Sequence, residues 1–178
     1  NTAALGFGGE EPAKSAKTES WNGTNWTEVN DLNTARQSLG GVGTNTAALA
    51  FGGFAPPGRV AVTESWNGSN WTEVNDLNSA RNNLAGAGIQ TAALAFGGLN
   101  PGLSPGPRQA ITELWNGSSW TEVNDLNTAR STLAGNGITT AALAFGGTTG
   151  STIGATEEWN GTNWTEVNDL NVARSGLA

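Results

Sequence analysis

The sequence predicts an all-β protein built from four copies of one unit. The stretch TESWNGTNWTEVNDLNTAR at residues 18–36 recurs with few changes at residues 63–81, 112–130 and 156–174, and a shorter piece, TAALAFGG or TAALGFGG, precedes each copy. Turn residues separate short strand-like runs, and no stretch shows helical periodicity. Repeated units need their neighbours to bury their faces. We therefore expect a single domain over residues 1–178, with units at about 1–36, 37–81, 82–130 and 131–178.

Each unit is predicted to contain four strands. In the second unit the first strand covers residues 38–44, and its glycines indicate a crowded position where another backbone comes close. The second strand is TAALAFGG, in which Leu94 and Phe96 lie on one face and Ala93 and Ala95 on the other, because side chains alternate along a strand. Large residues of one sheet can then pack over the alanines of the next. TESW and NWTEV form the third and fourth strands, joined by an Asn-Gly turn that favours type I′ geometry.

The segments between the second and third strands are the part of the repeat that varies. They are rich in proline, glycine and charge, which predicts loops. Because they differ between units, we expect any partner to bind there. The predicted loops cover residues 10–17, 54–62, 99–111 and 148–155, and the candidate contact residues in them are Lys14, Arg59, Arg108 and Thr149.

Four strands in a period of 44 to 49 residues are typical of a β-propeller blade, so we expect four blades of four antiparallel strands. Gly52 and Gly53, Trp71 and Arg81 stand where kelch repeats keep glycines, a tryptophan and often an arginine, while Trp66 replaces the usual tyrosine. The chain thus resembles the kelch family over all four units. The sequence WNGTNWTEVNDLN is also similar to repeat arrays in environmental phage and bacterial surface proteins.

The order of the repeated pieces predicts how the ring closes. The chain starts with the second, third and fourth strands of a blade and ends with ARSGLA, the beginning of a first strand. We expect residues 175–178 to supply the innermost strand of the N-terminal blade. Small residues such as Gly86 and Gly88 in the strand nearest the axis favour a narrow ring of four blades. Two chains that form eight blades together are the alternative.

Composition excludes several classes of function. Histidine, cysteine, tyrosine and methionine are all absent, which removes the usual metal ligands and most general bases. The kelch-like resemblance suggests a comparison with galactose oxidase, whose site needs histidines and tyrosines. Sialidases also use a propeller fold, and they need a tyrosine. We therefore expect no enzyme and no cofactor. The formal net charge of −7 argues against a nucleic-acid partner, and no apolar run approaches the roughly 20 residues that span a bilayer.

The charged residues that recur in every unit are expected to serve the fold. The arginine that closes each unit is predicted to anchor the turn between blades by pairing with a glutamate or aspartate, with ligand binding as the alternative. The glutamate of NWTEV is predicted to be a solvated or cross-strand charge, because an active site seldom repeats around a ring. The arginines are Arg36, Arg81, Arg130 and Arg174, and the glutamates are Glu28, Glu73, Glu122 and Glu166.

The eight tryptophans allow two interpretations. At identical positions in each unit they are typical of a core, where each buries roughly 150 to 250 Å². Indole faces also stack on sugars, so the alternative is a lectin with one site per blade. The tryptophans are Trp21, Trp26, Trp66, Trp71, Trp115, Trp120, Trp159 and Trp164.

Two hypotheses of function follow. The first is a non-enzymatic structural or adhesion module, a propeller subunit of a fibre, filament or virion appendage that binds a protein partner or self-associates. The second is a glycan-binding lectin. Both place the protein outside the cell, at a cell surface, in a secreted fibre or on a virion.

Overall fold

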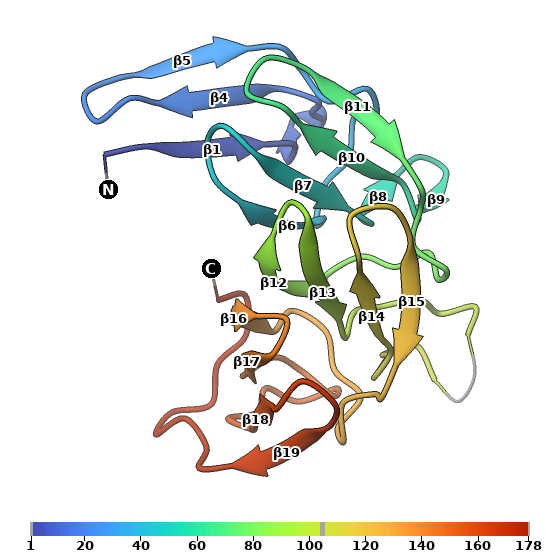
Figure 1. The fold of residues 1–178 in the computed structure, drawn as a ribbon. Helices are drawn as coiled ribbons and strands as arrows, with labels where there is room; N and C mark the ends of the chain where they lie inside the picture. The colour runs from blue at the N-terminus through green and yellow to red at the C-terminus, as the bar shows by residue number, and fades with distance from the viewer. Residues whose placement is uncertain (1, 104–105, 178) are drawn as a thin grey trace.

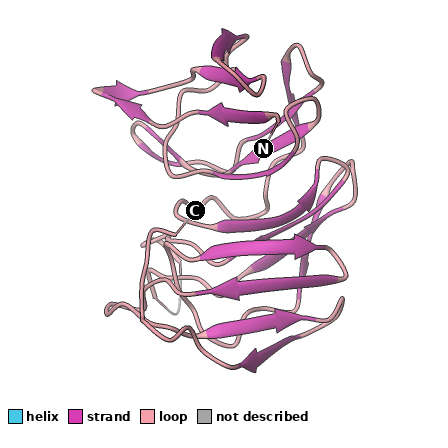
Figure 2. Ribbon diagram, turned by 90° about the vertical axis from the view of Figure 1, so that its left-hand side faces the viewer, coloured by secondary structure: helices cyan, strands magenta, loops and turns pink. Residues whose placement is uncertain are grey.

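The computed structural model describes residues 2–103 and 106–177, which form antiparallel sheets joined by turns and loops. No helix occurs within these ranges, so the all-β prediction is confirmed. The four main sheets follow one another in chain order along an arc, with the N-terminal and C-terminal sheets at its two ends (Figure 1). Figure 2 shows the same sheets from the side, each made of strands joined by short turns.

Three of the four main sheets contain four strands and the first contains three. The first sheet comprises β1 (Ala4–Phe7), β4 (Thr18–Trp21) and β5 (Trp26–Val29), and the second comprises β6 (Gly40–Gly43), β7 (Ala48–Phe51), β10 (Thr63–Trp66) and β11 (Trp71–Val74). The third comprises β12 (Ala85–Ile89), β13 (Ala92–Phe96), β14 (Thr112–Trp115) and β15 (Trp120–Val123), and the fourth comprises β16 (Ala134–Ile138), β17 (Ala141–Phe145), β18 (Thr156–Trp159) and β19 (Trp164–Val167).

Two small hairpins lie within segments that the sequence predicted as loops. They pair β2 (Glu10–Glu11) with β3 (Ala13–Lys14), and β8 (Phe54–Ala55) with β9 (Gly58–Arg59). Each of their strands has two residues, too few for the alternating pattern by which strands are recognised in a sequence.

Each four-stranded sheet runs outward in chain order, and the chain then returns to the first strand of the next sheet. The first strands lie together, because β12 contacts both β6 and β16. Repeated sheets with this connectivity fit a propeller-like fold. In the first sheet β1 pairs with β4, and no described strand pairs with its other edge.

Backbone hydrogen bonds link the units where each new first strand begins. The N–H of Asn83 donates to the Ser38 carbonyl at 2.8 Å, Thr132 donates to Asn83 at 2.9 Å, and Gly176 donates to Thr132 at 2.9 Å. All four residues have a positive φ, between 53° and 67°. This conformation is costly for a β-branched residue such as Thr132, so the surrounding contacts must hold it.

The outer hairpins form where the sequence predicted them, but with a different turn. Trp66 lies opposite Trp71, with ring centroids 5.3 Å apart. Only the glycine of the turn, Gly68, has a positive φ, whereas a type I′ turn would require the same of Asn67. Instead the Asn67 side chain accepts hydrogen bonds from the backbone N–H groups of the two residues after the glycine, each at 2.9 Å. An asparagine that satisfies two amides in this way favours an Asx-type turn.

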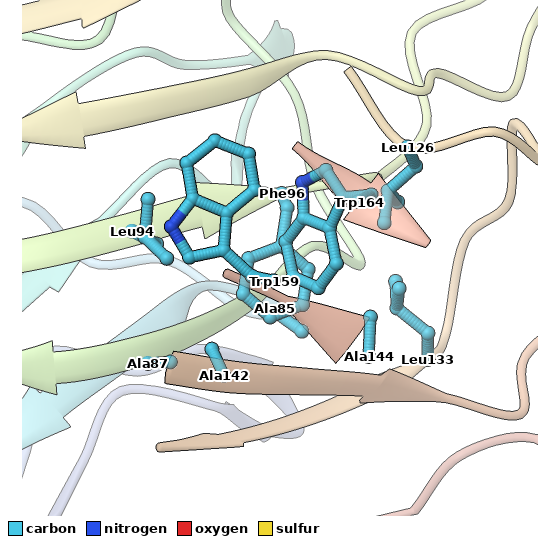
Figure 3. Close-up of a cluster of buried hydrophobic side chains, with 10 residues drawn as sticks. All are labelled: Ala85, Ala87, Leu94, Phe96, Leu126, Leu133, Ala142, Ala144, Trp159 and Trp164. Atoms are coloured by element: carbon cyan, nitrogen blue, oxygen red, sulfur yellow. The ribbon is translucent and has the colours of Figure 1, made fainter. Parts of the chain in front are cut away.

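Neighbouring sheets pack large residues over small ones, as the alternation in TAALAFGG predicted. Leu94 and Phe96 of β13 share a buried cluster with Ala142 and Ala144 of β17 and with the tryptophans of the fourth sheet (Figure 3). The Phe96 ring meets Trp164 edge-on with centroids 4.9 Å apart. The two preceding interfaces repeat this contact through Phe7 with Trp71 and Phe51 with Trp120, at 5.0 and 5.2 Å.

The glycines of the first strands allow this close approach. A Cβ on Gly86 would lie 2.6 Å from the Phe51 ring and 3.0 Å from Val42. On Gly135 it would lie 2.4 Å from the Phe96 ring. These strands are therefore the crowded ones, as their composition predicted.

We expect Gly86→Ala to lower the free energy of unfolding by about 1 to 3 kcal/mol, because the added methyl overpacks the interface. Urea unfolding followed by tryptophan fluorescence measures this. Gly58→Ala is the matched control, since no atom lies within 4 Å of its added Cβ, and a surface change of this kind stays within about 0.5 kcal/mol. Equal effects of the two substitutions would contradict the packing described above.

Candidate functional site

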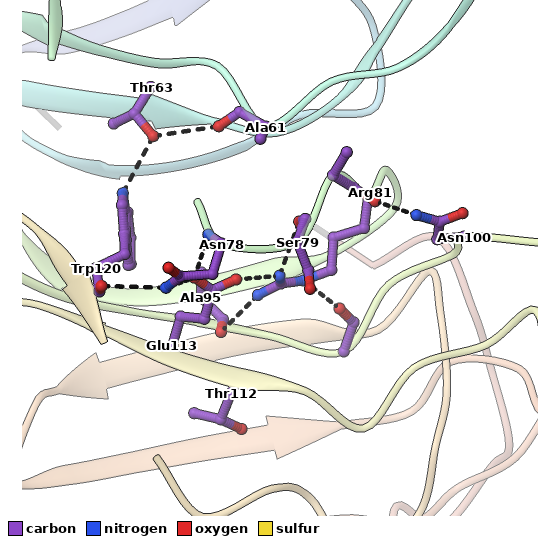
Figure 4. A network of polar contacts seen from close by, with 12 residues as sticks. Ala61, Thr63, Asn78, Ser79, Arg81, Ala95, Asn100, Thr112, Glu113 and Trp120 are labelled. Atoms are coloured by element: carbon purple, nitrogen blue, oxygen red, sulfur yellow. Dashed lines mark hydrogen bonds and ion pairs between the residues drawn. The ribbon is translucent and has the colours of Figure 1, made fainter. Parts of the chain in front are cut away.

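The arginine that closes a unit reaches into the next sheet. Arg81 is fully buried and forms an ion pair with Glu113 of β14, also fully buried (Figure 4). Its guanidinium donates further hydrogen bonds to the carbonyls of Ala95 and Gly97, at 3.2 and 3.0 Å. The side chain thus connects three segments of polypeptide at the interface between two units.

The same ion pair occurs at the other two interfaces, where Arg36 meets Glu64 and Arg130 meets Glu157, each at 3.2 Å. Burial lowers the pKa of all three arginines below the ordinary value of a guanidinium, and the facing glutamates oppose this shift. A buried charge that loses its partner is strongly destabilising. We infer that the three pairs act as structural ties between sheets.

An asparagine completes each tie. The second carboxylate oxygen of Glu113 accepts hydrogen bonds from the backbone N–H and the side-chain amide of Asn78, at 2.7 and 2.8 Å, and the same amide donates to the Trp120 carbonyl at 3.0 Å. Asn33 with Glu64 and Asn127 with Glu157 repeat these contacts. The turn NDLN thereby holds the outer hairpin of the following unit.

The tryptophan N–H groups are also used between sheets. Trp120 donates its indole N–H to the Thr63 hydroxyl of the preceding sheet at 3.1 Å, and the Thr63 backbone N–H donates to Asp76 at 3.0 Å. Trp71 and Trp164 donate to the equivalent threonines at 3.0 Å. These polar contacts fix the orientation of rings that also pack in the core.

The tryptophans of the first sheet differ from the others. Trp26 is 51% exposed, whereas its equivalents Trp71, Trp120 and Trp164 are each 5% exposed. Trp21 is half-buried, and the remaining three, Trp66, Trp115 and Trp159, are buried. Six of the eight indoles therefore lie inside the interfaces and have no free face for a sugar to stack on.

At the two ends of the arc, the residues equivalent to the buried arginines and glutamates of the ties are exposed. Arg174 at one end and Glu19 at the other are exposed, although their equivalents are buried. Leu143 is 41% exposed, while Leu49 and Leu94 are completely buried. The first and last sheets thus expose residues whose equivalents are buried at the three formed interfaces.

The glutamates of the fourth strands face solvent. Glu28, Glu73, Glu122 and Glu166 are all exposed. Within residues 2–103 and 106–177, no group of three or more acidic side chains has a geometry that could hold a metal ion.

A backbone hydrogen bond at the same repeat position joins the two ends of each variable loop. The first glycine of the double glycine donates its N–H to the last residue of the loop, as Gly52 does to Val62 at 3.0 Å, and the second donates to the closing arginine, as Gly53 does to Arg81 at 2.9 Å. The other units repeat the first bond between Gly8 and Lys17, Gly97 and Ile111, and Gly146 and Ala155.

The structure brings two of the four candidate loop residues together. The Lys14 ammonium lies 5.7 Å and the Arg59 guanidinium 5.8 Å from the centroid of the Phe54 ring, distances typical of cation–π contacts. Arg108 pairs with Leu99 within its own loop, and Thr149 is exposed in the fourth loop. The first two loops therefore share one surface, which we call the Phe54 surface after the ring between Lys14 and Arg59.

The glutamates that carry the ties were not singled out from the sequence. Glu64, Glu113 and Glu157 sit in the third strands, next to a buried threonine. Their signal was present, because a glutamate follows the first threonine in every copy of the long repeat. Recurrence alone did not identify them as buried, because the exposed glutamate of NWTEV also recurs in every copy.

No family model matches the chain, and no curated protein matches its sequence. Within the described residues no helix has the length and apolar character needed to cross a membrane.

We expect Glu113→Ala to lower the free energy of unfolding by about 3 to 5 kcal/mol, because Arg81 keeps a buried charge without its partner. Urea denaturation measures the change. Glu122→Ala removes the exposed carboxylate of the same hairpin, and its effect should stay within about 0.5 kcal/mol.

The double variant Arg81→Met with Glu113→Leu should be more stable than Glu113→Ala alone, since apolar replacement of both partners avoids the unpaired charge. Equal losses for Glu113→Ala and Glu122→Ala would refute the tie.

Proposed function

We propose that the protein is a non-enzymatic structural or adhesion module, a kelch-like propeller subunit of an extracellular fibre, filament or virion appendage. The observation that carries this proposal is the use of the repeated polar residues. The arginines, glutamates and asparagines that recur in each unit are buried in contacts between sheets, as Arg81, Glu113 and Asn78 illustrate. Repetition in this chain therefore maintains a scaffold, and the units differ most in the loops.

The Phe54 surface supports a role in binding a protein partner. The Phe54 ring beside the Arg59 guanidinium combines apolar area with a cation, and aromatic residues and arginine are both enriched at protein interfaces. The Lys14 ammonium near the same ring is paired with Glu10. The Phe54 surface lies on the variable loops, where a partner can be selected without altering the ties.

The proposed assembly is tested by analytical ultracentrifugation and negative-stain electron microscopy over a range of protein concentrations. We expect concentration-dependent association into regular particles or fibres, which Phe54→Ser with Arg59→Ser should weaken. Thr149→Ser, on another loop, is the control. A monomer at every concentration would argue against self-association.

We further propose that the four sheets form one ring, closed by the C-terminal segment at the first blade. The beginnings of the second, third and fourth units and the C-terminal segment line one hollow of about 190 Å³, whose lining includes Leu39, Leu84, Leu133 and Leu177. The exposed Arg174 and Glu19 are the two halves of a fourth tie. Gly176 and Leu177 line this hollow, but residues 175–177 do not form a strand. Residue 178 lies outside the described residues.

Ring closure predicts that Arg174 and Glu19 are energetically coupled. Arg174→Glu should lower the melting temperature, and adding Glu19→Arg should restore it, because the swapped charges attract again. Thermal unfolding monitored by circular dichroism measures both. A coupling that grows with protein concentration would indicate pairing between chains, and the absence of coupling would refute closure.

The second candidate is a lectin. Trp26 is the observation that favours it, since this indole is half exposed beside the partly exposed Trp21. Titration with a panel of glycans, followed by tryptophan fluorescence, distinguishes the candidates. Saturable quenching that Trp26→Leu abolishes would favour the lectin, and an unchanged spectrum with every glycan would remove it.

A further inference from the structure

A hollow of about 260 Å³ lies between the third and fourth sheets, which both have all four strands (Figure 1). The third sheet contributes residues of β14 and β15 to it, and the fourth contributes the end of β18 and the β18–β19 turn. We call it the Leu114 hollow. Its lining residues are Leu114, Val123, Asn124, Trp159, Gly161 and Thr162.

A polar bridge spans the equivalent place between the second and third sheets. Gln90, in the β12–β13 turn, donates its side-chain amide to the Ser65 hydroxyl at 2.9 Å and to the Trp66 carbonyl of the preceding sheet. By the repeat, Ser65 is the equivalent of Leu114, and Gln90 is the equivalent of Thr139.

Both members of this bridge differ between the third and fourth sheets. Leu114 has no group that accepts a hydrogen bond, and the hydroxyl of Thr139 sits on Cβ, two carbons short of the position of a glutamine amide. Leu114 instead packs against the buried cluster of this interface, which includes Trp159. The features that repeat in this chain serve the fold, so two changes that meet at one groove indicate a separate use for it.

The lining defines the ligand that the hollow fits. An apolar cavity of about 150 Å³ takes up one benzene molecule, so the Leu114 hollow has room for one substituted ring. None of its six lining residues is charged, which favours a neutral ligand, because a buried charge needs a partner.

The rim of the hollow adds a hydrogen-bond acceptor. The Asn124 amide donates to the Thr162 carbonyl at 3.0 Å and to the Asn163 side-chain oxygen at 2.8 Å. Its two N–H groups are thereby used, and its own carbonyl oxygen is left to accept from a ligand. The Thr162 hydroxyl lies on the same rim.

We propose that the Leu114 hollow is a binding site for a phenolic ring. Leu114, Val123 and Trp159 receive the ring, and its hydroxyl donates to Asn124 at the rim. The site does not depend on assembly into a fibre or on ring closure, and it fails or stands separately from them.

The test is a titration of the full-length, ¹⁵N-labelled protein with phenol, followed by NMR. A ligand of this size binds with a Kd on the order of 1 mM, so the titration extends to about 10 mM. We expect saturable shifts of the Trp159 indole N–H and the Asn124 side-chain amide. Anisole, which has no hydroxyl to donate, should bind about fivefold more weakly. Absence of saturation at these two groups, or equal binding of anisole and phenol, would overturn the proposal.

Two variants remove the site in different ways. Leu114→Ser removes an apolar wall, and Thr139→Gln introduces the side chain that fills the equivalent groove, so each should weaken phenol binding at least about tenfold. Thr72→Gln makes the same change at an exposed threonine of the second sheet and should leave binding unchanged. Phenol binding that survives Thr139→Gln in the folded protein would refute the location.

The site should also be transferable. Ser65→Leu with Gln90→Thr gives the groove between the second and third sheets the residues of the Leu114 hollow. This double variant should bind two phenol molecules per chain, with new shifts at Trp115, the equivalent of Trp159. Equal shifts of Trp115 and Trp159 in the unmodified protein would show that the differences between the grooves do not matter and would overturn the proposal.

The source of the ring is a free phenol or a tyrosine of another protein, since this chain contains no tyrosine and a second copy cannot supply one. N-acetyltyrosinamide distinguishes the two. Binding tighter than that of phenol assigns the site to a tyrosine side chain, and its exclusion while phenol binds assigns the site to a small molecule.

Discussion

The structure depends on a guanidinium that is buried between two sheets and must be met there by a carboxylate. Desolvation of Arg81 costs more than a single contact can offset, and Glu113 together with two backbone carbonyls surrounds it. Asn78 saturates the other carboxylate oxygen. These partners come from two units, so the network is complete only when both are folded and docked. Folding of one unit is thereby linked to that of the next, as in other repeat proteins.

The same interface explains why each sheet has a large face and a small face. A tie of fixed length holds neighbouring sheets at one separation, and Leu94 and Phe96 fill that space against alanines. The space between two neighbouring sheets is limited, so a phenylalanine on one side requires a glycine on the other. The exposed Leu143 and Trp26 show what the faces look like without a neighbour.

Strand positions, the hairpins and the large-over-small packing could be predicted because each leaves a local pattern: alternation, an Asn-Gly pair, or a run of small residues. The partner of Arg81 could not be chosen, since several acidic residues repeat with the same period and periodicity alone does not tell a buried glutamate from a solvated one. The turn type at Asn67 was predicted wrongly because its side chain, rather than a second positive φ, satisfies the backbone. The contact of Lys14 and Arg59 with one ring joins two loops of different sequence, for which no repeat gives a signal.

The hydrogen bond that closes each variable loop has a consequence for how such a chain can diversify. Gly52 and Val62 are held together at the base of their loop, and Gly97 and Ile111 are held in the same way although more residues separate them. The entropy of closing a loop grows only slowly with its length, so a longer insert changes little at its base. The four variable loops are therefore suitable positions for grafting foreign peptides. A display scaffold made from this chain could carry up to four unrelated sequences on one array of sheets.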